Sequence, residues 1–316
     1  ASMLGQDSYA ESVSNDPLAL RSPHFEGKVK SIVWLFMTGA PSQVDTWDYK
    51  SELQKRDGQD LAGADPKTGF FTTSGKILKS PFGWAQHGRS GAWVSDIFPH
   101  LSHHVDDMAF IHNLVGKSGV HSTATLLQAT GFLLPGFPGA GCWVSYGLGS
   151  INDNLPTFVV LPDHRGYASN GPRNWSSAFL PASNQGTTIF PQRESPVEDL
   201  HATADFITPG SEADGRRLLQ SLNQRYNQRH PGDSRLESRL RSYELAARMQ
   251  LSAPETFDLS QETAATLKAY GLAESGGTWP TEINVPEEAD CFGRKCLIAR
   301  RLLERGVRFI QIWSGN

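Results

Sequence analysis

Cysteine is scarce in this chain of 316 residues, which contains only Cys142, Cys291 and Cys296. An odd and sparse set excludes a disulfide framework, and the spacing of the last two is not that of a CxxC zinc site. We expect no disulfide between Cys291 and Cys296, because both lie in one predicted helix.

Long apolar runs and an excess of basic residues are also missing. No apolar stretch reaches the length that crosses a membrane. The net charge of −4 is small and argues against a nucleic-acid-binding surface. Apolar residues at 38% and aromatic residues at 10% are enough to build a core, so the sequence predicts a folded protein.

Strands that alternate with helices predict an α/β protein with a mostly parallel sheet covered on both faces. Runs rich in β-branched and aromatic residues predict the strands Val29–Phe36, Met108–Ile111, Pro156–Leu161 and Val307–Trp313. Apolar spacing and end signals predict the helices Ala92–Val105, Ser122–Thr130, 211–229, 234–251, 260–271 and Glu287–Arg305. Pro99 would kink or split the first of these. Residues 1–27 are predicted to be a flexible tail. Residues 28–316 are predicted to form one domain, which includes a helical segment at about 211–271.

The loop after the first predicted strand carries Ser42, Asp45 and Asp48. The carboxyl end of a parallel strand is where α/β proteins hold ligands. Carboxylate oxygens suit a hard cation, and a neighbouring charge can activate a hydroxyl. The alternative is turn chemistry, in which Ser and Asp cap a helix and bond to their own backbone.

His121, Ser122 and Thr123 lie at the start of a predicted helix. A hydroxyl there meets backbone N–H groups and the positive end of the helix dipole, which suits a nucleophile or a bound oxyanion. The alternative is an N-cap role for Ser122, with His121 as a hydrogen-bonded loop residue.

Asp163, His164 and Arg165 follow the third predicted strand and open a long loop rich in Gly, Pro, Asn and Ser. Arginine suits bidentate recognition of phosphate or sulfate, and the three together fit an anion-binding or metal-adjacent loop. The alternative is an ordinary turn, because Asp, Arg and Gly also populate turns.

Several long motifs, in this order, resemble the bacterial family catalogued as domain of unknown function 1501. The resemblance extends from about Val29 to Asn316. Its most specific segments are IVWLFMTGAPSQVDTWDYK at 32–50, SGAWVSDIFPHL at 90–101, SGVHSTATLLQATG at 118–131, GCWVSYGLGSINDNLPTFVVLPD at 141–163 and RGVRFIQIWSGN at 305–316. That family is similar to the alkaline phosphatase and sulfatase superfamily. The resemblance therefore implies a three-layer α/β sandwich and a metal-dependent hydrolase of phosphate or sulfate esters.

The segment SGVHSTATLLQATG resembles the start of the nucleophile helix in the phosphatases. This match implies Ser122 or Thr123 as the nucleophile, although a strict count of the spacing to Gly131 reaches His121. No acid directly follows the first strand, so the resemblance implies that Asp45 or Asp48 stands in as a metal ligand.

The rest of the implied site comes from the strand-end loops. Asp163 is a further candidate ligand for a divalent zinc, magnesium, calcium or manganese ion, and Arg165 and Ser42 are candidates to hold a small-molecule or carbohydrate ester.

Family members usually continue beyond the last strand with further acidic and histidine motifs, and they tend to begin with a twin-arginine export signal. Ala1–Gly5 looks like the remnant of such a signal. The resemblance thus implies a chain shortened at both ends, without activity by itself, from a periplasmic or secreted protein. The alternative is an exported binding or scaffold protein that kept the fold and lost the chemistry.

Overall fold

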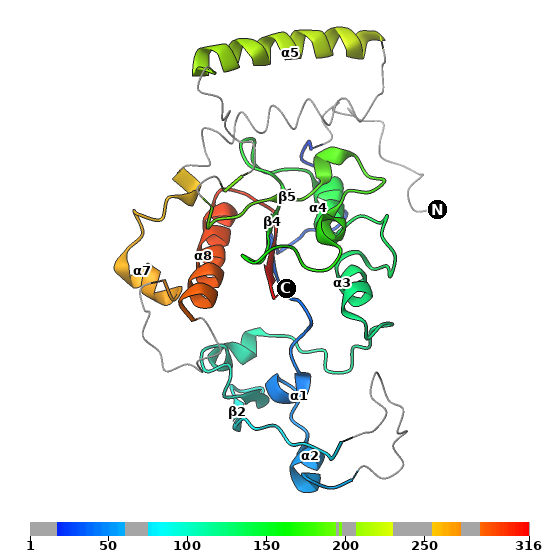
Figure 1. Cartoon of the computed structure of the whole chain (residues 1–316), viewed down its shortest axis with the longest axis vertical. Helices are drawn as coiled ribbons and strands as arrows, with labels where there is room; N and C mark the ends of the chain where they lie inside the picture. Colours follow the sequence, from blue (N-terminus) through cyan, green and yellow to red (C-terminus); the bar gives the residue numbers. More distant parts are fainter. Residues whose placement is uncertain are drawn as a thin grey trace. The chain divides into compact units, whose positions relative to one another are not determined.

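The computed structural model describes residues 18–60, 75–193, 196–197, 207–229, 255–272 and 285–315. The chain divides into two compact units (Figure 1). Unit 1 consists of Ala1–Thr38 and Ser118–Asn316, and unit 2 of Gly39–Lys117. None of the described helices is long and apolar enough to cross a membrane.

Unit 1 is built on a parallel sheet with the strand order β1-β6-β4-β5. Its strands are β1 (Ile32–Met37), β6 (Phe309–Ser314), β4 (Phe158–Leu161) and the short β5 (Thr187–Thr188). All of β4 and almost all of β6 are buried, as expected for continuous apolar runs in the middle of a parallel sheet. The predicted α/β class with a mostly parallel sheet is confirmed.

Alternate side chains of β4 and β6 point to opposite faces of the sheet, and each face has its own apolar core. Helix α8 (Val285–Glu304) covers one face, while α3 (His121–Thr130) and α4 (Ala140–Leu148) cover the other (Figure 1). The α8 core contains Val159, Leu161, Ile298, Leu302, Ile310 and Ile312. The α3–α4 core contains Ala129, Cys142, Phe158, Val160, Phe309 and Trp313.

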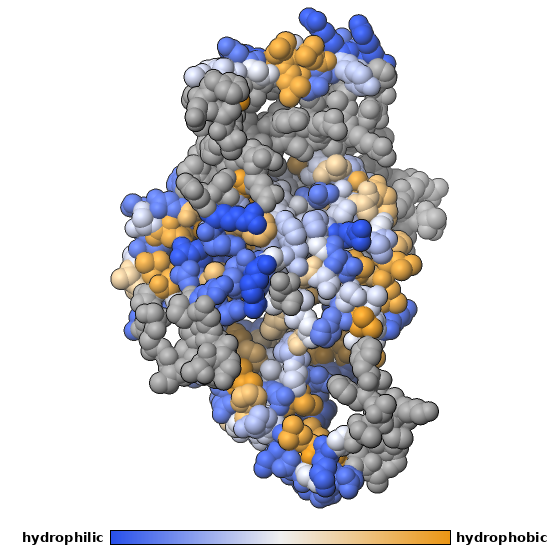
Figure 2. All heavy atoms as spheres, in the orientation of Figure 1, coloured by the Kyte–Doolittle hydropathy of each residue, from blue (hydrophilic) through white to orange (hydrophobic). Residues whose placement is uncertain are grey.

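The outer surfaces of these layers differ in polarity. Hydrophilic residues gather over α8, whereas hydrophobic residues lie on the side of α3 and α4 (Figure 2). The exposed apolar residues there are Phe132, Leu134, Trp143 and Phe179.

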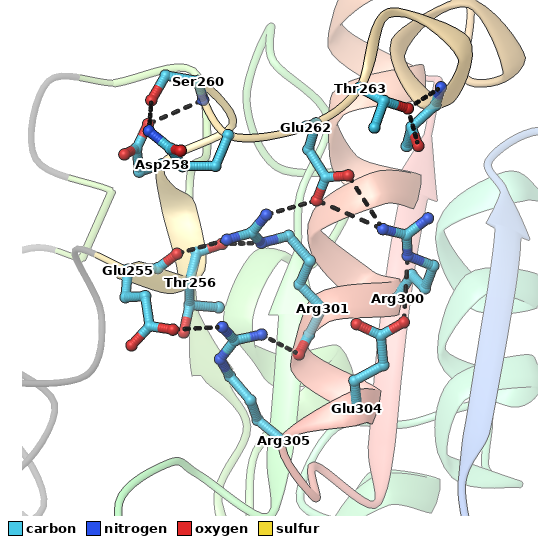
Figure 3. Close-up of polar contacts among 12 residues, drawn as sticks. Glu255, Thr256, Asp258, Ser260, Glu262, Thr263, Arg300, Arg301, Glu304 and Arg305 are labelled. Atoms are coloured by element: carbon cyan, nitrogen blue, oxygen red, sulfur yellow. Dashed lines mark hydrogen bonds and ion pairs between the residues drawn. The ribbon is translucent and has the colours of Figure 1, made fainter.

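Arginines of α8 hold the segment that leads into α7 (Ala264–Ala269) (Figure 3). Arg301 donates from Nε to the Thr256 carbonyl at 2.9 Å and pairs with Glu262. Arg300 lies 3.2 Å from the same carboxylate. The hydrogen bond from Arg301 lowers the pKa of Glu262 and outweighs the opposing effect of burial.

The described residues of unit 2 form two short helices, a two-stranded antiparallel ribbon and a 3₁₀-helix. They are α1 (Gln43–Thr46), α2 (Ser51–Arg56), β2 (Trp84–His87), β3 (Ala92–Ser95) and η2 (Leu101–Asp107). Asp106 of η2 accepts hydrogen bonds from the backbone N–H groups of Arg89 and Ser90, so its side chain holds the turn between the two strands.

Several sequence predictions of secondary structure were wrong or incomplete. The predicted helix Ala92–Val105 is divided between β3 and η2, because Ala92–Ser95 pairs with β2 as a strand and Pro99 separates that strand from η2. Met108–Ile111 forms no strand. The elements α1, α2, α4, β2 and β5 were not predicted.

Other predictions agree with the structure. Helix α3 ends at Gly131, which has the left-handed φ of 83° typical of a helix C-terminus. Helix α5 (Pro209–Arg229) matches the prediction for 211–229, while the predicted helix 234–251 lies outside the described residues. Cys291 and Cys296 both lie on α8 and are free thiols, as expected.

Candidate functional site

The carboxyl ends of β1, β6 and β4 lie side by side at one edge of the sheet in unit 1. Each strand continues into a segment at that edge: Thr38 follows β1, Gly315 follows β6 and Asp163 follows β4 by two residues. The N–H of Gly315 donates to Asp163 Oδ2 at 2.9 Å, so the segments that follow β4 and β6 are tied together.

Asp163 is the buried carboxylate of this edge, with 2% of the residue exposed. Its Oδ1 accepts from the backbone N–H of Arg165 at 3.0 Å and from Arg165 Nε at 2.9 Å. Burial alone would raise the pKa of Asp163, but the hydrogen bonds from Arg165 and Gly315 outweigh it and lower the pKa to about 2. Asp163 is therefore an ionised carboxylate over the whole physiological range of pH.

Two carboxylates of α8 face the loop after β4. The side chain of His164 is 8% exposed, with Nδ1 3.5 Å from Asp163 Oδ1 and Nε2 3.0 Å from Glu287 Oε1. Arg165 Nη1 lies 3.0 Å from Glu288 Oε1, while 44% of the Arg165 side chain stays exposed. Arg165 is thus held by Asp163 through Nε and Nη2 and by Glu288 through Nη1, while part of its side chain stays open to solvent, where it can meet an anion.

Lys295 of α8 is a buried cation behind this edge, with 2% of the residue exposed. Its Nζ donates to the carbonyls of Pro162 and Trp313 at 3.2 and 2.6 Å, so it occupies acceptors at the ends of β4 and β6. Burial lowers the pKa of Lys295 because it disfavours the charged form.

Sequence reasoning missed Lys295, Glu287 and Glu288 as members of this cluster. A lysine at the spacing of the apolar residues Ile298 and Leu302 on the predicted helix was the available signal.

The first turn of α3 differs from its prediction. The helix begins at His121 and its N-cap is Val120, so the N-cap interpretation of Ser122 was wrong. Ser118 Oγ lies 2.5 Å from Thr123 Oγ1, which also donates to the Val120 carbonyl at 3.1 Å. The Thr123 hydroxyl is therefore engaged locally.

Ser122 is half-buried and His121 is exposed. Within the described part of the chain, the Ser122 hydroxyl makes no hydrogen bond, whereas the Ser122 carbonyl accepts from Asn170 Nδ2 at 2.7 Å. Asn170 belongs to the loop that begins at Asp163. The structure therefore brings the start of α3 and the loop after β4 into contact through Asn170.

Ser42, Asp45 and Asp48 lie on one short stretch of unit 2, at and just after α1. Ser42 is the exposed N-cap residue, and its carbonyl accepts from the Asp45 N–H at 3.1 Å. Asp48 pairs with Lys50 at 2.8 Å. These residues are thus close to one another, but they belong to a different unit from Asp163.

A metal site was predicted from Asp45, Asp48 and Asp163. Among the described residues, no three His, Cys, Asp or Glu side chains are grouped so that they could hold a metal ion. Both oxygens of Asp163 already accept N–H hydrogen bonds. These hydrogen bonds occupy lone pairs on both carboxylate oxygens of Asp163, and the predicted metal site stays a prediction.

One comparison with known proteins gives a match. The sequence model of the family described as Protein of unknown function (DUF1501) matches residues 29–316. No curated protein and no solved structure matches the chain.

Proposed function

The chain belongs to the DUF1501 family, and we propose that it is a hydrolase of phosphate or sulfate esters with the three-layer architecture of the alkaline phosphatase and sulfatase superfamily. One observation carries the proposal: the loop that follows β4 joins Arg165, held by the buried Asp163, to the first turn of α3 through Asn170. An arginine and a helix start on one sheet edge are two features that recognise oxyanions.

Arg165 and the first turn of α3 would bind the ester oxygens. The first backbone N–H groups of a helix have no acceptor within it, and the helix dipole favours an anion there. Arg165 brings a positive charge that Asp163 holds in place, and part of its side chain is open to solvent. Glu288 lies 3.0 Å from Arg165 Nη1 and partly compensates this charge.

Ser122 is the hydroxyl that we assign as the nucleophile, because Thr123 is engaged by Ser118 and the Val120 carbonyl. In the first step the Ser122 oxygen bonds to phosphorus or sulfur, the ester bond breaks, and the alcohol leaves with the serine proton. Water then cleaves the bond to Ser122 and releases phosphate or sulfate. A divalent ion, when bound, would supply Lewis-acid stabilisation of the leaving group.

The test is the hydrolysis of p-nitrophenyl phosphate and p-nitrophenyl sulfate by the protein at its full natural length. Rates are measured after chelation and after addition of zinc, magnesium, calcium or manganese. Ser122→Ala should lower kcat by at least about a hundredfold, as expected when a nucleophile is lost. Ser51→Ala is the matched control, because Ser51 is a serine in the first turn of α2, in unit 2. Full activity of a Ser122→Ala, Thr123→Ala double variant would exclude both hydroxyls as the nucleophile.

A binding or scaffold protein is the second candidate. It is favoured by the same polar groups being satisfied within the chain: both oxygens of Asp163 and the hydroxyl of Thr123 already have partners. Metal analysis separates the two candidates. A stoichiometric metal that restores ester hydrolysis supports the enzyme, whereas the absence of metal and of hydrolysis after reconstitution supports the binding protein.

A further inference from the structure

Unit 2 contains a cavity of about 270 Å³ that the proposed hydrolysis does not use. Its wall is mainly aromatic. The residues that line it include Trp47, Asp48, Tyr49, Trp93, Phe110 and His112. All of them belong to unit 2, so the cavity is formed by one unit alone.

The aromatic rings form two groups, and each group joins residues that lie far apart in the sequence. Tyr49, which precedes α2, stacks on Trp93 of β3 with ring centroids 4.3 Å apart and an angle of 21°. The ring centroids of Trp47 and Phe110 are 5.3 Å apart. Phe110 in turn stacks on His112, with ring centroids 5.6 Å apart and an angle of 10° between the ring planes. These contacts hold the rings in place, so the walls of the cavity are formed before any ligand arrives.

Trp93 is 37% exposed although it is one of the largest apolar side chains of the unit. A tryptophan that is held by stacking and still partly open to solvent offers a flat apolar surface to a ligand. The cavity therefore has the form of a binding site with aromatic platforms and a few polar groups.

The polar groups indicate the chemistry of the ligand. The side chain of Asp48 is 17% exposed, and its Oδ2 lies 2.8 Å from Lys50 Nζ. Lys50 compensates the charge of Asp48, so the carboxylate is a hydrogen-bond acceptor rather than an unpaired anion. An organic cation would gain most from an uncompensated carboxylate beside the rings. A neutral ligand with hydroxyl groups fits better, because the hydroxyls can donate to Asp48 and exchange hydrogen bonds with His112.

The size of the cavity agrees with one small ring. Its volume of about 270 Å³ lies just below the usual range of small-molecule sites, about 300–1,000 Å³. We propose that this cavity binds one sugar ring, with an apolar C–H face of the ring on the aromatic wall and hydroxyl groups directed at Asp48. The proposal does not depend on ester hydrolysis in unit 1, because every residue that it uses lies in unit 2.

The test is a titration of the protein with the methyl glycosides of glucose, galactose and mannose and with N-acetylglucosamine, followed by tryptophan fluorescence and calorimetry. At least one of these sugars should bind at a single saturable site. Trp93→Ala should weaken that binding at least about tenfold, as for loss of a central aromatic contact. Trp93→Phe should keep most of the affinity, and Asp48→Asn should weaken it by about tenfold.

The control is Trp143→Ala, because Trp143 is 43% exposed, close to the exposure of Trp93, and belongs to unit 1. This variant should bind the sugar with unchanged affinity. Circular dichroism shows whether each variant is folded. The proposal is overturned if none of the sugars binds the folded wild-type protein, or if folded Trp93→Ala binds as tightly as the wild type. It is also overturned if tetramethylammonium saturates the site in place of the sugars.

Discussion

Replacement of Asp163 by Asn tests how much the ionised carboxylate at the carboxyl end of the sheet contributes to stability. The substitution keeps the shape of the side chain and removes its charge. In the folded protein the carboxylate accepts hydrogen bonds from the Arg165 side chain and from the N–H groups of Arg165 and Gly315. These partners favour the ionised form and lower the pKa of Asp163 to about 2, although burial opposes them.

The expected magnitude follows from that pKa. Folding lowers the pKa of Asp163 from its ordinary value of 3.8 to about 2. At about 1.4 kcal/mol for each pKa unit, the ionised carboxylate contributes about 2 kcal/mol to the free energy of unfolding near neutral pH. Asp163→Asn should therefore lower the stability by about 2 kcal/mol at neutral pH.

The sign of the pH dependence is set by the depressed pKa. The contribution is fully present above the unfolded value of 3.8 and is lost as the pH falls through the folded value of about 2. The difference between the wild type and Asp163→Asn should therefore be about constant above pH 5 and about half as large near pH 3.

Urea denaturation at several values of pH between neutral and about pH 3 measures this difference. Asp107→Asn is the control, because Asp107 is an exposed aspartate at the end of η2. A stability difference between the wild type and Asp163→Asn that stays the same from neutral pH to about pH 3 would show that the hydrogen bonds to Asp163 do not favour its charged form.

Two further predictions concern the core. Gly141→Ala should destabilise unit 1 by about 1–3 kcal/mol in urea denaturation, because its Cβ would lie 2.6 Å from the Phe158 ring. Gly147→Ala on the same helix meets nothing within 4 Å and should be neutral or slightly stabilising; equal effects of the two would contradict the close packing of α4 on the sheet. Cys142 is buried, and burial raises the pKa of its thiol to about 12. Iodoacetamide should therefore leave it unlabelled in the native protein and label it after unfolding, as measured by mass spectrometry; rapid native labelling would be inconsistent with its place in the core.

The main strands and the longest helices could be predicted because their signals are local. Pro156–Leu161 and Val307–Trp313 are continuous runs rich in β-branched and aromatic residues, and they correspond to β4 and β6. The helix predicted for Glu287–Arg305 corresponds to α8, since its apolar residues recur at helical spacing over several turns.

The prediction for Ala92–Val105 was wrong for a physical reason. Its apolar residues have helical spacing, but Val94 pairs with Ala85 across a short antiparallel ribbon, and Pro99 separates that strand from η2. A pairing with another segment decided the structure of this stretch, and spacing within the stretch carries no information about it.

The sequence by itself determined the α/β class, the absence of a disulfide framework and the position of Asp163, His164 and Arg165 just after a strand, because each depends on composition or on neighbouring residues. Only the tertiary structure decided what these side chains touch. The hydrogen bond between Asp163 and the Gly315 N–H joins residues 152 positions apart, and that between Lys295 and the Pro162 carbonyl joins residues 133 apart. Such contacts form because burial of the two apolar faces of the sheet brings distant segments together, and the polar groups carried with them must then find partners among the atoms they meet.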